Sequence, residues 1–314
     1  MWGASMSYPP VGKNNRVLVT GGSGFIGAAL CKLLLLRGYQ VWVLSRHPER
    51  VRPRLDAAVR LASSLEDLGA VDFGAIINLA GKPMAESRWS TAVKQALRDS
   101  RIDLTYALLA WCQERQQFPP VLINGSAIGI YGNGADRILT ESSPTGDDFA
   151  ARLCADWEEA AAGFAAHGVR VCMLRTGVVL DREGGALARM LPAFRWGLGG
   201  RLGTGEHFMS WIHRQDLLQI IIRLLEDESL SGAFNATAPE ACRNRDFTRQ
   251  LAECLHRPAI FPMPAPILRL LFGEFADGLL LASQRVHPER LLQIGFTFSY
   301  PGLKDAFSAI LKKV

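Results

Sequence analysis

The chain has 314 residues, of which 48% are hydrophobic and 21% charged, and its net charge is +5. This composition is typical of a globular protein and excludes a disordered or fibrous chain. The arginines are scattered, without the basic stripe and interleaved aromatic residues of nucleic-acid binders, so we expect no nucleic-acid partner. The six cysteines lack CxxC spacing and no apolar run reaches the roughly 18 residues of a membrane span. We therefore expect a cytoplasmic protein with reduced thiols and no membrane partner.

The first half of the sequence alternates between strand-like and helix-like segments. Apolar runs predict strands at 16–20, 39–46, 59–63 and 74–81, and again at 120–132, where the strand leads into a loop, and at 169–180. Helical patterns lie between them at 28–38, 90–115 and 147–168. The alternation with short connections predicts an α/β fold, a doubly wound Rossmann-type parallel sheet with helices on both faces.

The second half has a different character. Residues 187–213 are rich in glycine and aromatic side chains, which predicts loop with brief structure. A helix at 215–230, a late strand at 232–238 and a helix at 245–257 follow. The apolar, proline-punctuated end of the chain predicts a small, mainly helical cap with its own packing.

A glycine-rich segment, TGGSGFIG at 20–27, follows the first predicted strand and begins the first predicted helix. Such glycines allow a tight turn and a close approach of backbone amides to a pyrophosphate, and the helix start favours an anion. A purely structural turn is the alternative. The predicted dinucleotide contacts are Gly21, Gly22, Ser23, Gly24, Phe25, Ile26 and Gly27.

The end of the second predicted strand indicates which dinucleotide is bound. NAD-binding versions usually place a carboxylate there for the ribose 2′-OH. This chain has Ser45, Arg46 and His47 instead, and a guanidinium suits a 2′-phosphate. The cofactor is therefore predicted to be NADP(H), with an ordinary surface arginine as the alternative. We expect a flexible extension at 1–15, an NADP-binding domain at 16–186, and a substrate-side and cap region at 187–314 that supplies some segments to the sheet.

Paired motifs carry a family resemblance. With TGGSGFIG, NLAG at 78–81, NGSAIGIYG at 124–132 and WIHRQD at 211–216, the chain resembles extended short-chain dehydrogenases/reductases. With SRIDLT at 100–105, TGVVL at 176–180 and the tail segments 264–286 and 295–303, it resembles more closely their atypical "epimerase family", which has a C-terminal domain of its own.

The resemblance implies further cofactor contacts. It implies that Ser45, Arg46 and His47 lie near the adenosine phosphate and Ser63 and Ser64 near the adenine. It also implies that NLAG backs the cofactor, that Arg88 reaches the cofactor, and that Val178 of TGVVL lies along the nicotinamide half. The residues that it adds to the site are Ser63, Ser64, Ala80, Gly81, Arg88 and Val178.

The family's usual catalytic pair is missing. Short-chain dehydrogenases carry a serine, and a tyrosine and a lysine as YxxxK on the next helix, where the ammonium lowers the phenol's pKa and holds the ribose. Ser126 matches the serine, but the helix offers Phe149 and Leu153 in one register and Ala150 and Cys154 in the next.

Other acid–base candidates are few. Tyr131 could act as an acid, although it follows the serine strand closely. Glu141 could act as a base, or it is a turn residue. His213 could face the substrate cleft, or it makes structural hydrogen bonds. Cys154 could titrate, or it is a buried thiol that only packs. No motif predicts a metal.

The sequence thus predicts an NADP(H)-binding oxidoreductase or epimerase without YxxxK, acting on an unknown carbonyl or nucleotide-sugar-like small molecule. The alternative is a non-catalytic NADP(H)-dependent sensor or regulatory module. A homodimer is one assembly that the sequence leaves open.

Overall fold

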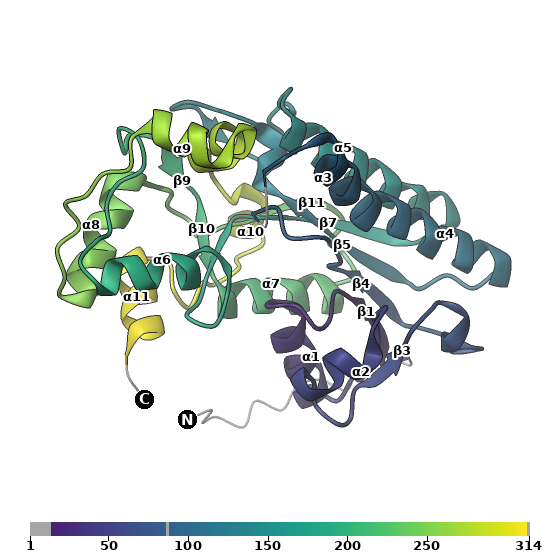
Figure 1. Ribbon diagram of the computed structural model, residues 1–314. Coiled ribbons are helices and arrows are strands. Elements are labelled where there is room, and N and C mark those ends of the chain that lie inside the picture. Colours follow the sequence, from purple (N-terminus) through teal and green to yellow (C-terminus); the bar gives the residue numbers. More distant parts are fainter. Residues whose placement is uncertain (1–13, 86–87, 313–314) are drawn as a thin grey trace.

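The computed structural model describes residues 14–85 and 88–312, and a parallel sheet forms the centre of this part of the chain (Figure 1). Its order is β11-β7-β5-β4-β1-β2-β3, and every neighbouring pair is parallel. The strands are β1 (Arg16–Thr20), β2 (Gln40–Leu44), β3 (Arg60–Ala62), β4 (Ala75–Asn78), β5 (Val121–Ala127), β7 (Arg170–Thr176) and β11 (Gly232–Ala236).

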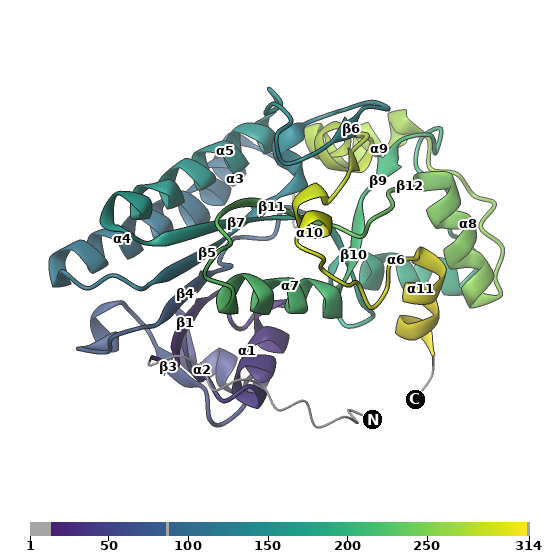
Figure 2. The same cartoon turned by 180° about the vertical axis from the view of Figure 1, so that it is seen from behind.

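Helices cover both faces of the sheet. Figures 1 and 2 show α1 (Gly27–Leu36) and α7 (Arg214–Glu226) on one face. The other face carries α3 (Thr91–Arg98), α4 (Leu104–Arg115) and α5 (Phe149–Ala162). Side chains alternate along each strand, so Val17 and Val19 pack toward α1 and α7 while Leu18 packs toward α4. The predicted doubly wound α/β sheet is confirmed.

The strand order reverses between β1 and β4. From β1 the chain proceeds to β2 and β3 on one side, and β4, β5 and β7 follow on the other. The connections at the carboxyl ends of β1 and β4 therefore diverge and leave a crevice there, which is where doubly wound sheets bind ligands.

The C-terminal region is mainly helical, as predicted, and packs around its own apolar cluster. Leu187, Leu191, Phe194, Phe247 and Phe307 are buried together in it. Its helices are α6 (Gly185–Arg195), α8 (Asn244–Leu255), α9 (Ala265–Phe272), α10 (Glu289–Gln293) and α11 (Leu303–Leu311). The helix α7 and the strand β11 also belong to this half of the sequence but lie against or within the sheet.

The prediction of loop for 187–213 is wrong at its start, where α6 forms. Pro192 lies inside this helix and Gly185 begins it, so local propensity argues against it. The spacing of Leu187, Leu191 and Phe194 puts them on one face, and burial of that face in the C-terminal cluster outweighs the propensity.

Short strand pairs lie outside the main sheet, and two of them connect its region to the C-terminal region. The pairs are β8 (Val178–Leu180) with β10 (Trp211–His213), β9 (Phe208–Met209) with β12 (Cys242–Arg243), and β6 (Ile138–Leu139) with β13 (Arg285–Val286). The remaining segments are α2 (Pro48–Val51), the 3₁₀ turns η1 (Arg52–Arg54), η2 (Glu66–Leu68), η4 (Ile128–Tyr131) and η5 (Gly163–His167), and the π-helical turns η3 (Asp99–Asp103) and η6 (Ala276–Leu280).

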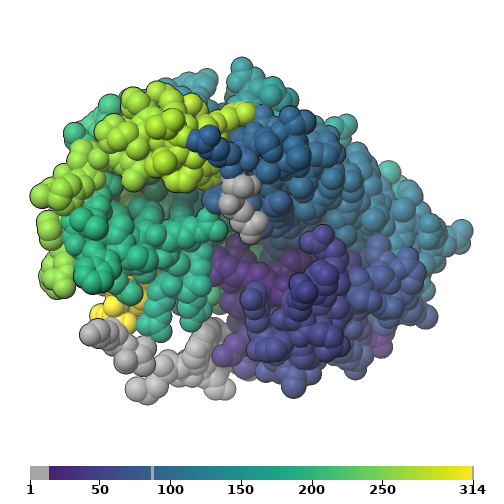
Figure 3. All heavy atoms as spheres, in the orientation of Figure 1, coloured from purple at the N-terminus to yellow at the C-terminus, as the bar shows by residue number. Residues whose placement is uncertain are grey.

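Figure 3 shows a hollow in the molecular surface between the C-terminal region, in green, and the sheet region, in purple and blue. At the top of the view in Figure 1, α9 of the C-terminal region lies near α3 of the sheet region, and Lys94 and Glu274 form an ion pair between the two regions. Across residues 14–85 and 88–312, none of the helices has the length and apolar character that crossing a membrane requires. The predicted extension at 1–15 lies almost wholly outside the described residues.

Candidate functional site

The loop between β1 and α1 has room for backbone only. Gly21 has a φ of +68°, and a Cβ on it would lie 2.6 Å from the carbonyl oxygen of Leu79. A Cβ on Gly22 would strike Val43, and one on Gly27 would overlap the carbonyl oxygen of Gly21. The glycines are therefore required by the close packing of β1, β4 and α1.

The amino end of α1 is free of competing groups. No side chain caps it, and its first turn contains no acidic residue. Unpaired N–H groups at such an end attract an anion, and a close backbone approach is what a pyrophosphate needs. The loop therefore fits the diphosphate of a dinucleotide.

The side chains of the loop pack away from its backbone. Phe25 lies against Gly184, and the Arg214 guanidinium is 5.1 Å from the centre of its ring. Ile26 packs on the core beneath the sheet. Ser23 and Gly24 border a cavity of about 1170 Å³ between α1 and α7. Phe25 borders the same cavity, so the contacts predicted for this residue stay a prediction, as do those of Ile26.

The end of β2 carries a cation without a partner. Arg46 is exposed, and its guanidinium makes no hydrogen bond or ion pair with any residue that the structure describes. Ser45 is held by a 2.9 Å bond from its amide to the carbonyl oxygen of Ala62, and its hydroxyl accepts a bond from His47 N at 3.4 Å. None of the three residues directly after β2 is a carboxylate, so Arg46 is available to an anionic ligand.

Ser63 and Ser64 follow β3, the strand next to β2, and both are bound to Asp67. The Asp67 carboxylate accepts hydrogen bonds from the amides of Ser63 (2.9 Å) and Ser64 (3.1 Å) and from the Ser63 hydroxyl. These bonds lower the pKa of Asp67. The two serines thus lie on the same edge of the sheet as Arg46.

The NLAG segment lies beside the phosphate loop. The amide of Ala80 donates to the Thr20 hydroxyl at 3.2 Å, and Gly81 follows at the carboxyl end of β4. Val178 begins β8, which pairs with β10. Arg88 instead extends toward the C-terminal region, where its Nε donates to the carbonyl oxygen of Leu271 at 2.8 Å.

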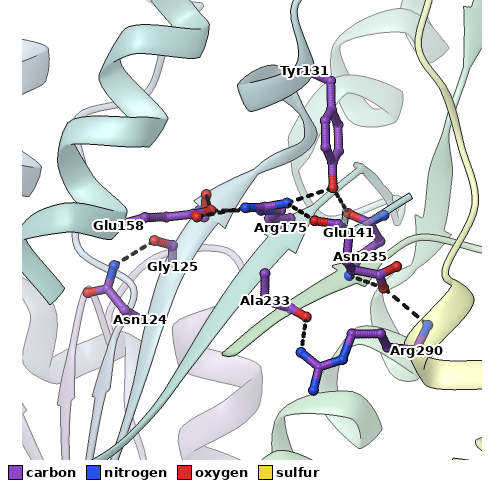
Figure 4. Close-up of polar contacts among 10 residues, drawn as sticks. Asn124, Gly125, Tyr131, Glu141, Glu158, Arg175, Ala233, Asn235 and Arg290 are labelled. Atoms are coloured by element: carbon purple, nitrogen blue, oxygen red, sulfur yellow. Dashed lines mark hydrogen bonds and ion pairs between the residues drawn. The ribbon is translucent and has the colours of Figure 1, made fainter. Parts of the chain in front are cut away.

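Ser126 is buried at the end of β5 and bonded to an ion pair. Its hydroxyl donates to Glu158 Oε1 at 2.6 Å. Arg175 on β7 binds both oxygens of Glu158, with two N–O distances of 2.9 Å (Figure 4). Both charged side chains are nearly enclosed, with 11% and 13% of their areas exposed. The Ser126 proton is therefore directed toward Glu158.

The same guanidinium also holds Tyr131. Arg175 Nη1 donates to the Tyr131 hydroxyl at 2.9 Å, and that hydroxyl donates to Asn235 Oδ1 at 2.6 Å (Figure 4). Burial outweighs the neighbouring cation and raises the pKa of Tyr131. Glu141 Oε1 accepts a hydrogen bond from the backbone N–H of Asn235 at 3.0 Å. Tyr131 thus connects β7 and β11, and its proton is occupied by Asn235.

The structure decides which register of α5 faces the end of β5. Ala150 and Cys154 lie against Gly129, within 4 Å of the place that a Cβ would take there. Phe149 packs instead on the Trp89 ring, 5.1 Å between centres, and Leu153 on the same cluster. Burial raises the pKa of the Cys154 thiol to about 12. The face that would carry tyrosine and lysine therefore presents a methyl group and a protonated thiol.

His213 has a structural partner. Its Nδ1 accepts a hydrogen bond from Gln215 N at 3.1 Å, which caps α7, and its ring lies 3.9 Å from that of Tyr300. Burial lowers the pKa of His213. Among the described residues, no three His, Cys, Asp or Glu side chains gather closely enough to hold a metal ion.

Sequence reasoning missed Glu158 and Arg175. The available signal was a charged residue within each apolar pattern, Arg175 in the middle of the strand predicted at 169–180 and Glu158 one turn after Cys154. It also missed Arg101, which lies against the NLAG segment. These pairings join positions far apart in sequence, so only the fold reveals them.

Comparison with known proteins agrees with this geometry. The model of the NAD dependent epimerase/dehydratase family matches residues 17–236, and a domain of unknown function, DUF1731, matches residues 263–310. The chain is 38% identical over 293 residues to the epimerase family protein Mb2239 of Mycobacterium bovis, covering 93% of this chain and 96% of that protein. It is 37% identical over 303 residues to a chloroplastic SDR39U1 homolog of Arabidopsis thaliana, covering 94% and 86%.

A solved structure is similar over nearly the whole chain. The crystal structure of human epimerase family protein SDR39U1 with NADPH has a TM-score of 0.83 and 33% identity, covering 94% of this chain and 98% of that one. The resemblance predicted from the motifs is thereby confirmed. The chain belongs to the NAD dependent epimerase/dehydratase family and ends in the C-terminal domain that accompanies it in the "epimerase family" proteins.

Proposed function

We propose that this protein binds NADP(H) and transfers hydride between the nicotinamide and a small carbonyl or hydroxyl compound. The observation that carries the cofactor choice is Arg46, an exposed guanidinium without a partner in the described chain, at the end of β2. The 2′-phosphate of NADP(H) would bind this guanidinium through a bidentate, charge-assisted contact. The NADPH in the human relative's structure supports the same choice.

The residues that would hold the cofactor lie along one edge of the sheet. The loop from Gly21 to Gly27 and the amino end of α1 fit the diphosphate, because they leave room for backbone amides and carry no competing acid. Ala80, Gly81 and Val178 are proposed along the nicotinamide half. When bound, NADPH would supply the hydride.

The oxygen of a reduced carbonyl also needs a proton. The α5 face offers Ala150 and Cys154, and the thiol's pKa of about 12 keeps its proton in place. Ser126 donates its hydrogen to Glu158, and Tyr131 donates its hydrogen to Asn235. We therefore infer that water supplies the proton. The Ser126 oxygen retains lone pairs that can accept a hydrogen bond from a substrate hydroxyl.

The hollow between the two regions (Figure 3) is the proposed place for the substrate, because doubly wound sheets bind ligands outside the carboxyl ends of their strands. We also propose that the protein works in the cytoplasm, which its six free thiols support.

The test is transfer of an isotope. The protein is incubated with NADPH that carries deuterium at C4 on either face and with a fractionated small-molecule extract, and the products are examined by mass spectrometry. We expect one carbonyl compound to gain one deuterium from one face only, with heat-denatured protein as the control. Failure to label any compound, while NADP(H) is released from the purified protein on denaturation, would contradict hydride transfer.

One observation favours a second function. The face of α5 carries no proton donor, and Ser126 and Tyr131 are bonded within the fold. A protein that senses NADP(H) without chemistry needs only the loop and Arg46. That function predicts a protein partner that binds the NADPH-loaded form and not the apo form, with no labelled product.

A further inference from the structure

Arg101 lies beside the NLAG segment, at the carboxyl end of β4. It follows α3 on the π-helical turn η3 (Asp99–Asp103), and its guanidinium lies against Gly81 at the carboxyl end of β4. A Cβ on Gly81 would be 2.8 Å from Arg101 Cζ. The strand β4 lies between β1, which bears the phosphate loop, and β5, which bears Ser126. An insertion such as a π turn in a helix often marks a functional position.

The charge of Arg101 is not balanced by an ion pair with any residue in 14–85 or 88–312. Its side chain is half-buried, and no carboxylate of the described residues pairs with it. Burial lowers the pKa of Arg101, the direction expected for a cation without a counter-charge. A partly buried cation without a counter-charge is costly, so a ligand that supplies oxygen atoms would relieve this cost.

The guanidinium also has donors to spare. Nη1 donates to the carbonyl oxygen of Leu97 at 3.1 Å and to the Ser100 hydroxyl at 3.4 Å, and Nη2 donates to the carbonyl oxygen of Lys82 at 3.0 Å. A guanidinium has five N–H groups, so Nε and one hydrogen of Nη2 have no partner in the part of the chain described. The three bonds fix the guanidinium in place while leaving it able to bind a ligand.

Arg101 also approaches the α5 face that lacks a lysine. Its Cζ lies 5.3 Å from the centre of the ring of Trp157, which is on α5. Cys154 lies in the register that faces β5, where a YxxxK helix would place its ammonium. The side-by-side position of α3, α4 and α5 in Figures 1 and 2 makes this approach possible.

We propose that Arg101 binds the nicotinamide half of NADP(H) and supplies there the positive charge that related enzymes place on the α5 lysine. This inference rests on the proposed use of NADP(H). The cation comes from the turn between α3 and α4 instead of from α5, and it lies against Gly81 of the NLAG segment.

The test compares a whole cofactor with half of one. Dissociation constants are measured for NADPH and for 2′,5′-ADP, which has the adenosine half and no nicotinamide ribose, in the wild type, Arg101→Met and Arg101→Lys. We expect Arg101→Met to weaken NADPH binding about tenfold or more and 2′,5′-ADP binding less than about twofold. Arg101→Lys should recover most of the loss.

The control is Arg98→Met, on the same side of the sheet, which removes an arginine that is paired with Asp156. It should change neither affinity. Equal weakening of both ligands by Arg101→Met, or no weakening of either, would overturn the inference. Failure of the wild type to bind NADPH would instead overturn the proposed function.

A second variant covers the case in which Arg101→Met does not fold, as judged by thermal unfolding. Gly81→Ala keeps the arginine but occupies the space of its guanidinium, so the end of the side chain must move. It should show the same selective loss of NADPH affinity. Unchanged binding of both ligands in a folded Gly81→Ala variant would also count against the inference.

Discussion

The loop after β1 and the β5-facing side of α5 lie along the same edge of one sheet, yet they present different things to a ligand. The loop presents backbone, with glycines that leave space and an uncapped helix end. The α5 face presents a methyl group and a buried thiol, and the nearby hydroxyls of Ser126 and Tyr131 are bonded to Glu158 and Asn235. Binding depends here on backbone shape, whereas the usual acid–base chemistry depends on side chains that can change without disturbing the sheet. The two parts of a dehydrogenase site are therefore separable.

The largest expected effect is on the α5 side, where Glu158→Ala breaks a buried ion pair. The variant leaves Arg175 enclosed without its carboxylate, and Ser126 without its acceptor. We expect the free energy of unfolding to fall by about 3–5 kcal/mol in urea titrations. Affinity for NADPH should hardly change in the folded fraction, because the phosphate loop has no bond to this pair.

The exposed neighbour Glu159 provides the matched control, and Glu159→Ala should cost less than about 0.5 kcal/mol. The double variant Glu158→Ala with Arg175→Met should recover part of the loss, because it removes the unpaired charge. A loss below about 1 kcal/mol for Glu158→Ala would mean that solvent reaches the pair and that the α5 side is less fixed than the geometry indicates.

The next effect is on the loop side, where Arg46→Ala removes the proposed 2′-phosphate contact. We expect NADPH binding to weaken by about 1.5–3 kcal/mol, the range for a lost charged hydrogen bond, while NADH binding and stability stay the same. Titration by nicotinamide fluorescence measures both affinities. Arg249→Ala, an exposed arginine on α8, is the control and should alter neither. Equal weakening of NADPH and NADH would remove the 2′-phosphate assignment.

The sequence predicts the loop side well and the α5 side poorly, for a physical reason. Gly21, Gly24, Gly27 and Arg46 act within one strand-loop-helix unit, so their spacing along the chain carries the geometry. The missing YxxxK is visible for the same reason. The pairing of Glu158 with Arg175 joins α5 to β7, and the place of Arg101 depends on a π turn, which no local pattern announces.

The helix α6 illustrates the same limit. Its glycine and proline predict loop, and only the C-terminal cluster that buries Leu187, Leu191 and Phe194 makes a helix favourable. The C-terminal region as a helical cap was predictable from its apolar, proline-punctuated composition. The strand pairs that connect it to the sheet region, such as β6 with β13, were not predictable, because each strand is only two or three residues long.

The smallest expected effect is a pH dependence of stability that belongs to the loop side and the C-terminal region and not to α5. Burial lowers the pKa of His207 and His213 below their ordinary value of 6.5, and for His213 the nearby Asp216 and Asp181 oppose this only in part. The unfolded chain therefore binds protons that the folded chain does not, so stability is full above about pH 6.5 and falls as the pH drops through the folded-state pKa values. Cys154 keeps its proton throughout, with a pKa of about 12.

The measurement is the free energy of unfolding as a function of pH, between about pH 8 and pH 5. In the variant with His207→Gln and His213→Asn, this free energy should depend less steeply on pH, and asparagine can still cap α7. An unchanged slope would assign the acid sensitivity to carboxylates instead, and a change in NADPH affinity with the same pH dependence would mean that His213, at the cavity beside the phosphate loop, is coupled to the cofactor.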